Sequence, residues 1–422
     1  MKFRLPWANT ERKAHPAGAA YYVDLGSSWT RSKDARHYLT EGYQGNVVVY
    51  SAIQEIALAM SGLTVEVHDA NGLAEAHPAL ALLDRPNVTQ GWSGFCKQLF
   101  IDYGIYGELA MVRYPVNGRS APTELWHLCP YDITVEPGRG GLPSKYVHKK
   151  NNKEIEFPVD QVTGRSAVFF MKRYNPDNHW RGQSPLMAAA LAGDLHNTGM
   201  QWNYRLLRNG ARPPGIIKML AGVSGESIAR AREYFKRQIQ GSENAGEIPM
   251  LPDGMDWQDI GKTPADMDYQ GSLTKAEKLI ARAYGVPLPL IDNDAATFNN
   301  MKEAKERFYT DTVIPMFQEF LDQFGNWLLP SYGEGLRFAI DMDDIPALES
   351  MRDRAYQRMK VAVGSKPILT QDEARLTLGW DELGGAAAML DPVNSVADAA
   401  ANMFQDENAI KAMVAMAYGK AD

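Results

Sequence analysis

The feature of this 422-residue chain that most restricts its fold is one long helical pattern over about residues 301–329. Its apolar side chains recur at helical spacing along a single stripe, so one side of the helix must be buried against other elements. The stripe consists of Ala304, Phe308, Phe317, Phe320, Leu321, Phe324 and Leu328. Pro315 lies inside the pattern. Because a proline within a helix removes one hydrogen bond and clashes with the preceding turn, we expect a kink there.

The segment before this helix, residues 41–183, has the pattern of an α+β lobe. Apolar residues at helical spacing predict helices near residues 47–60 and 92–106, and a short helix from His77 to Leu83. Turn residues separate several short β-like runs, which favours an antiparallel sheet. These runs are 65–67, 109–114, 124–128, 133–135, 146–148 and 167–170. Residues 1–40 show no stable period and predict a flexible N-terminal arm.

A small insert between two helices is the next feature. Ser184 can cap the first helix and Pro185 can occupy its first turn, and the helical pattern runs on to about residue 210. The second helix, residues 273–284, ends at Gly285. The insert between them has the pattern of a β-α-β-β unit. Its predicted elements are a strand at 215–220, a helix at 224–240 and strands at 248–251 and 255–260.

The end of the chain is predicted to be mainly helical. A polar loop at 292–300 precedes the long helix, and a strand is expected at 336–340. Helices follow from Pro346 onward, and one of them opens with the capping-box pattern Thr370 to Glu373. The fold class predicted for the whole chain is therefore α+β, with an elongated arrangement of small lobes.

Composition excludes several classes of protein. Apolar residues make up 45% and charged residues 23%, and the formal net charge is −7, so no large basic DNA-binding face is expected. The two cysteines, Cys96 and Cys129, have no CxxC spacing and favour a reduced compartment. No apolar run approaches the roughly 18 residues that a membrane span needs, and the first residues do not have the pattern of a secretory signal. We expect a soluble protein without a membrane partner, made in a cytoplasm.

Motifs that carry chemistry are missing from the sequence. We find no GxxxxGK[ST], GxGxxG, GxSxG or HExxH, and the eight histidines are scattered, so no cofactor and no metal are expected. Asp292 and Asp294 begin like a calcium loop, but Ala296 and Thr297 stand where a ligand and the turn glycine should be. Asp341, Asp343 and Asp344 favour an acidic helix entry. A metal-dependent hydrolase or nuclease with a site at these three residues stays open as an alternative.

The predicted helix at 224–240 is basic. Arg230, Glu233, Lys236 and Arg237 lie on it, and the acidic residues can pair with the basic ones at local spacing. A solvated helix face and a docking surface are both compatible with this pattern.

Five short segments, in this order, resemble the portal proteins of tailed bacteriophages, and the HK97-type family in particular. They are Gly42-Tyr43 with Asn46 to Ile53, Trp180 to Leu186, Ala281 to Pro287, Phe308 to Pro315, and Leu369 to Arg375. The resemblance spans about residues 40–385. It implies a virion structural protein and not an enzyme, forming a homo-oligomeric ring, a dodecamer in the family, at one vertex of the capsid.

The resemblance also implies a division of the chain into lobes. The wing would be residues 41–183 completed by 336–341, the stem helices 184–210 and 271–286, and the clip 211–265. Loop 291–300 and helix 301–329 would face the channel, and residues 345–422 would form the crown and C-terminal tail. Within the clip, Arg230, Glu233, Lys236 and Arg237 would be the candidates that dock the terminase large subunit and then the head-tail adaptor.

The implied ligand is double-stranded DNA that passes through the channel without sequence-specific contacts. The tunnel loop would comprise Asp292, Asp294, Thr297, Phe298, Asn299 and Asn300. Lys302 and Lys305 either touch phosphates briefly or pair with the neighbouring Glu303 and Glu306. Phe317, Phe320 and Phe324 are expected in the core rather than stacked on DNA. The expected setting is a virion assembled in a bacterial cytoplasm with the major capsid protein and scaffold. Another phage structural protein, such as an adaptor, is the remaining alternative.

Overall fold

The chain divides into two units, residues 1–341 and 342–422, which we describe separately. The computed structural model describes residues 35–74, 76–115, 121–138, 140–208, 215–219, 225–226, 228–230, 233, 255–259, 269–292, 298–363, 369–380 and 382–384. Within the first unit the described helices include α1 (Ala35–His37), α2 (Val47–Ser61), α3 (Pro78–Asp84), α4 (Trp92–Tyr106), α5 (Pro185–Arg208) and α7 (Tyr269–Tyr284). They continue with α8 (Phe298–Phe308) and α9 (Ile314–Leu328), joined by the π-helical segment η7 (Tyr309–Val313).

Local capping explains where the first helices begin and end. The side chain of Asn46 accepts hydrogen bonds from the backbone N–H groups of Val48 and Val49 and so starts α2. Helix α4 ends at Gly107, whose φ of 71° is open to glycine and costly for other residues. The chain is helical earlier than its sequence predicts. Helix α1 and the π-helical segment η2 (Tyr38–Tyr43) occupy part of the predicted flexible arm.

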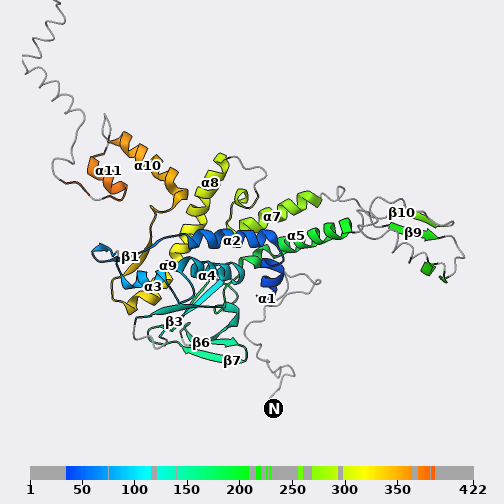
Figure 1. Ribbon diagram of the computed structural model, residues 1–422, viewed down its shortest axis with the longest axis horizontal. Coiled ribbons are helices and arrows are strands. Elements are labelled where there is room, and N and C mark those ends of the chain that lie inside the picture. The colour runs from blue at the N-terminus through cyan, green and yellow to red at the C-terminus, as the bar shows by residue number, and fades with distance from the viewer. Residues whose placement is uncertain are drawn as a thin grey trace, which may run out of the picture. The chain divides into compact units, whose positions relative to one another are not determined.

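The strands of the first unit pair antiparallel, but in more than one sheet (Figure 1). Strand β3 (Glu108–Tyr114) lies between β4 (Glu124–Leu128) and β8 (Val168–Lys172), whereas β6 (Pro143–Lys150) lies between β5 (Ile133–Pro137) and β7 (Lys153–Pro158). The antiparallel pairing expected in this lobe is therefore confirmed, but these strands divide between two three-stranded sheets instead of forming one. Alternation along a strand predicts its faces, but not which strand it pairs with.

A third sheet joins the two ends of the first unit. Strand β1 (Val65–Asp69) lies between β2 (Gly72–Leu73) and β11 (Arg337–Ile340). In the register of β1 and β11, Val65 lies opposite Ile340 and Val67 opposite Phe338. The strand predicted at 336–340 is thus present, and it pairs with a segment near the start of the lobe.

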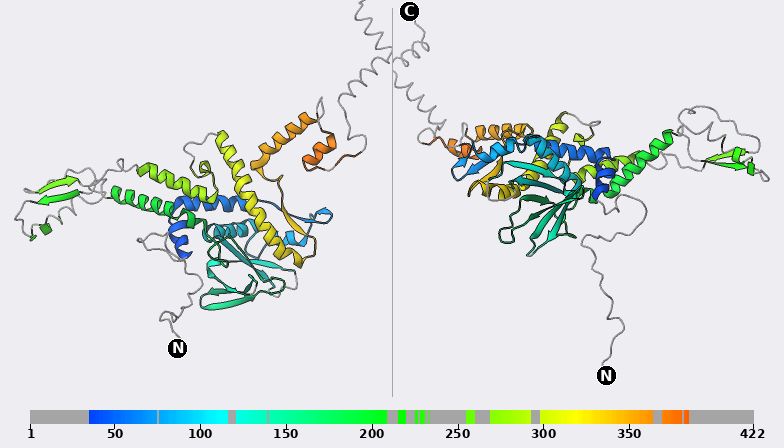
Figure 2. Two further views of the ribbon diagram at one scale, coloured as in Figure 1. Left: turned by 180° about the vertical axis from the view of Figure 1, so that it is seen from behind. Right: turned by 60° about the horizontal axis from the view of Figure 1, so that its bottom comes forward.

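The core of the first unit is built largely from aromatic rings on α4, β8 and α9. Phe317, Phe320 and Phe324 of α9 are fully buried, as expected for core residues. Phe320 packs against Phe100 of α4 and Phe169 of β8, with ring centroids 5.4 and 6.0 Å away. The predicted buried stripe of the long helix is therefore confirmed. Figure 2 shows α8, η7 and α9 following one another as one long yellow helical run.

Helices α5 and α7 lie side by side (Figure 1). Between them in the sequence, β9 (Gly215–Met219) pairs antiparallel with β10 (Met255–Asp259), so that Met219 lies opposite Met255. These are two of the three predicted strands of the insert, and the third, at 248–251, lies outside the described residues.

The second unit contains α10 (Glu349–Ala362) and α11 (Gln371–Thr377). Helix α11 opens with the predicted capping box, in which the Thr370 side chain accepts from the Glu373 N–H and the Glu373 side chain accepts from the Thr370 N–H. Among the described residues, no helix has the length and apolar character that crossing a membrane requires.

Candidate functional site

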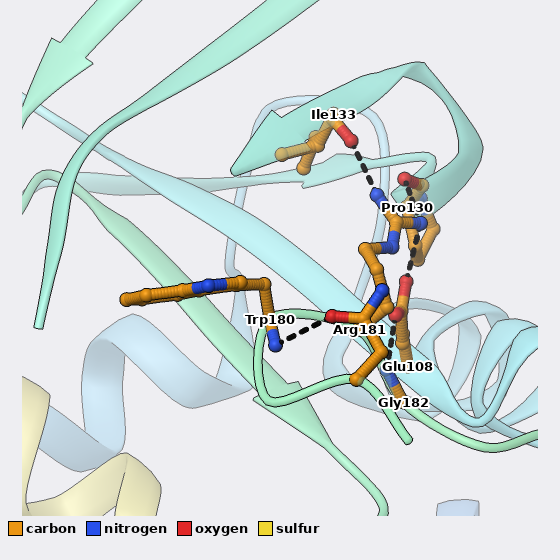
Figure 3. A network of polar contacts seen from close by, with 7 residues as sticks. Glu108, Pro130, Ile133, Trp180, Arg181 and Gly182 are labelled. Atoms are coloured by element: carbon orange, nitrogen blue, oxygen red, sulfur yellow. Dashed lines mark hydrogen bonds and ion pairs between the residues drawn. The ribbon is translucent and has the colours of Figure 1, made fainter. Parts of the chain in front are cut away.

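The segment that leads into α5 is anchored by a buried carboxylate (Figure 3). Glu108, at the start of β3, is 1% exposed. One of its oxygens accepts from Arg181 Nη2 at 2.6 Å, and the other accepts from the backbone N–H of Gly182 at 2.5 Å. Burial raises the pKa of Glu108, and the Arg181 charge together with the Gly182 N–H opposes that shift.

Arg181 links Glu108 to the sheet that contains β5. Its guanidinium also donates to the carbonyl of Ile133 at 2.6 Å and to that of Pro130 at 3.2 Å (Figure 3). A planar guanidinium with five donors can bind a carboxylate and two carbonyls at once, which a lysine cannot do in the same geometry. Arg181 therefore fixes the approach to α5 against both β3 and β5.

Two glycines allow the chain to pass close to itself here. A Cβ on Gly182 would lie 2.3 Å from the carbonyl oxygen of Gly107, and a Cβ on Gly107 would lie 2.3 Å from that of Gln183. Ser184 then donates to the Ile105 carbonyl at 2.6 Å and accepts from Leu186 N–H at 3.1 Å. Ser184 thus caps the start of α5, as its sequence position predicts, and also ties that start to α4.

The predicted tunnel loop is described only at its ends. Asp292 is exposed and follows the 3-10 turn Leu288–Leu290, whereas Asp294 and Thr297 lie outside the described residues. Helix α8 begins at Phe298, three residues before the predicted start of the long helix at 301. Phe298, Asn299 and Asn300 therefore lie in its first turn and not in a loop, and Asn299 and Asn300 are exposed.

Lys302 and Lys305 are exposed on α8. Within the described ranges, no carboxylate lies within ion-pair distance of either ammonium group. The interpretation that they only pair with Glu303 and Glu306 therefore finds no support in this structure.

Pro315 lies in the first turn of α9, directly after η7. Its missing N–H falls where the hydrogen-bond pattern already departs from α-helical. The helical run continues through the proline, and a bend of its axis there stays a prediction.

The predicted docking residues of the insert are only partly described. Arg230 and Glu233 lie in helical conformation and are exposed, while Lys236 and Arg237 lie outside the described residues.

Asp343, in the acidic segment after β11, pairs with an arginine of α10. In the second unit, Arg352 donates to the carbonyls of Met342 and Asp343 and lies 3.5 Å from the Asp343 carboxylate. Among the described residues, no group of three or more histidines, cysteines or acidic residues has the geometry to hold a metal ion.

Sequence reasoning did not identify Glu108. Arg181 was not predicted as a site residue either, and it falls within Trp180 to Leu186, one of the segments that resemble portal proteins. The available signal was a glutamate at the head of the otherwise apolar run Leu109 to Val112, because a charged residue entering a buried strand needs a partner.

The fold and these junctions define a structural subunit with two helices flanking a small β insert. The sequence matches the family described as "Phage portal protein" over residues 47–379. The chain belongs to this family, whose members are structural and not enzymatic components of phages. The alternatives of a hydrolase, a nuclease or an adaptor are thereby not supported.

Relatives extend over most of the chain. A protein of Rickettsia bellii (strain RML369-C) described as "Uncharacterized protein" is 30% identical over 349 residues, which cover 81% of this chain and 89% of that protein. The portal protein of Enterobacteria phage HK97 is 24% identical over 213 residues, 49% of this chain and 50% of that protein.

Solved structures have the same fold. A chain in the neck of a native gene transfer agent particle, computed with C12 symmetry, is 28% identical with a TM-score of 0.63, covering 83% of this chain and 94% of that one. A portal protein of the HK97 family from Corynebacterium diphtheriae has a TM-score of 0.54 at 13% identity, covering 76% and 100% of the two chains, and supports the fold alone.

Proposed function

We propose that this chain is the subunit of a twelve-membered portal ring at one vertex of a phage-like particle, through which double-stranded DNA enters and leaves. The observation that carries the proposal is the similarity, over 83% of this chain, to a chain in a neck computed with C12 symmetry. Assembly in a bacterial cytoplasm, with the major capsid protein and scaffold as partners, is part of the proposal.

In this proposal each part of the first unit has a role. Residues 41–183 with β11 form the wing, α5 and α7 form the stem, and the insert at 211–265 forms the clip. The segment 291–300, with α8 and α9 after it, faces the channel. In the second unit, residues 345–422 form the crown and tail.

Charge supports a channel that DNA passes without sticking. Twelve copies at −7 each give a ring of roughly −84, which repels phosphates. The exposed Lys302 and Lys305 would supply transient phosphate contacts beside Asp292, Asp294 and Thr297 to Asn300.

The clip is the proposed docking surface for the terminase large subunit and then for the head-tail adaptor. Arg230, Lys236 and Arg237, with Glu233 among them, would meet an acidic surface of the motor.

Negative-stain imaging of the purified chain tests the ring. Rings with a central hole and twelve-fold or neighbouring symmetry are expected in class averages. Small compact oligomers across several salt and protein concentrations would refute the proposal.

A further inference from the structure

Helix α5 exposes a face that carries almost no charge. Between Pro185 and Tyr204 it contains one aspartate, Asp194, and no glutamate, lysine or arginine. Leu191 is 78% exposed and Leu195 is 48% exposed. With the exposed Ala188 and Thr198 they recur at spacings of three and four residues, so they form one stripe, which we call the α5 stripe.

Helix α2 has a second such face. Its exposed residues are Val47, Tyr50 and Leu58, with exposed fractions of 64, 46 and 59%, and none of them is charged. They lie on one side of the helix, which we call the α2 stripe, while the opposite side packs on α4. Glu55 is the one charged residue of α2.

These faces differ from an ordinary solvated helix surface. Helix α7, in the same unit, exposes Leu279 as well, but surrounds it with the exposed Lys275, Lys278 and Arg282. Solvated surfaces are rich in charge, whereas continuous apolar stripes mark sites where another surface docks. The two stripes therefore have the chemistry of a covered surface.

The occupant that fits is a second copy of this chain. Copies around a ring of three or more subunits meet through two different patches, one from each neighbour. One subunit here offers two distinct uncharged stripes, and the similar neck chain stands in an assembly computed with C12 symmetry. We infer that the α5 stripe of one copy packs against the α2 stripe of the next, an inference that rests on the proposed ring.

A charge placed in the stripe tests the contact. Leu191→Arg should keep the helical content of the wild type in circular dichroism, since the position is exposed within the subunit, yet lose rings in mass photometry and negative stain. Val162→Arg is the matched control, because Val162 is 92% exposed but lies outside both stripes. Rings of Leu191→Arg in wild-type proportion would overturn the inference.

Cross-linking tests the pairing itself. In a Cys129→Ser background, Leu191→Cys is combined with Val47→Cys or with Leu58→Cys, and rings are oxidised mildly. A ladder of covalent multimers on a non-reducing gel is expected for at least one pair and for none of the three single variants. Intact rings without any ladder would refute this interface and leave the proposed function standing. A wild-type chain that forms no rings would refute both.

Discussion

The carboxylate of Glu108 holds the segment that leads into α5. Glu108 is buried and accepts hydrogen bonds from Arg181 and Gly182. Removing it by Glu108→Ala leaves the Arg181 guanidinium without its carboxylate partner and leaves the Gly182 N–H without its acceptor. Because breaking a buried ion pair is strongly destabilising, we expect a loss of about 3 kcal/mol, visible as a lower thermal midpoint. An unchanged midpoint would contradict this role.

The ionisation of Glu108 gives that junction a pH dependence. Burial raises its pKa in the folded state, so the neutral form contributes stability at low pH that is lost as pH rises through the folded value. Glu108→Gln keeps an acceptor for Gly182 and does not ionise. As the pH rises above 4.5, the ordinary pKa of a glutamate, we expect wild type to lose thermal stability relative to Glu108→Gln. Parallel pH profiles of the two proteins would count against burial as the dominant influence.

The close approach at Gly182 makes a second residue-scale prediction. A Cβ there would lie 2.3 Å from a backbone oxygen, which cannot move as a flexible side chain can. Gly182→Ala should therefore destabilise the protein by about 1–3 kcal/mol. Gly94→Ala is the matched control, because no atom within 4 Å would meet its Cβ and alanine favours a helix. The comparison fails if both variants melt alike.

At the scale of elements, α9 is held by its aromatic face. Phe320 is fully buried between Phe100, Phe169 and its neighbours on α9. Phe320→Ala should cost about 3–5 kcal/mol in the free energy of unfolding, from lost burial plus a cavity. Glu319→Ala, on the exposed side of the same turn, should stay within about 0.5 kcal/mol of wild type in the same denaturant titration.

The sequence predicts elements whose side chains carry a strong period. Helix α4 begins and ends at the predicted residues, and β4 matches its predicted run. Strand β7 was not predicted, although Ile155 and Phe157 alternate with glutamates in it, and only Phe157 of this strand is buried. The pairing of β1 with β11, and the contact of Glu108 with Arg181, join residues far apart in the chain. The local sequence pattern does not indicate which distant residues will contact each other.

At the scale of the whole molecule, the prediction concerns assembly and DNA together. Deleting Thr297 to Asn299 removes Thr297 and the first two residues of α8 and touches neither proposed stripe. Ring formation should survive, while DNA packaging or retention should fall. Measuring genome content of particles that carry the deletion, with rings counted in parallel, checks this. Normal genome content would refute a role for the segment in handling DNA.

The five residues of η7 form a π-helical turn, which accommodates one more residue between α8 and α9 than a regular α-helix would. Phe308 and Val313 are both buried although they stand five positions apart, a spacing that a regular α-helix would turn to different sides. A π-helical turn absorbs the additional residue and keeps both in one line. Deleting one residue of η7 would rotate α8 by roughly 100° about its axis, while α9 would stay packed in its present position. A change of one residue in length at this point would thus turn Lys302 and Lys305 to another side of the helix. It would also turn the buried Phe308 out of its line with Val313, while the aromatic residues of α9 stayed packed.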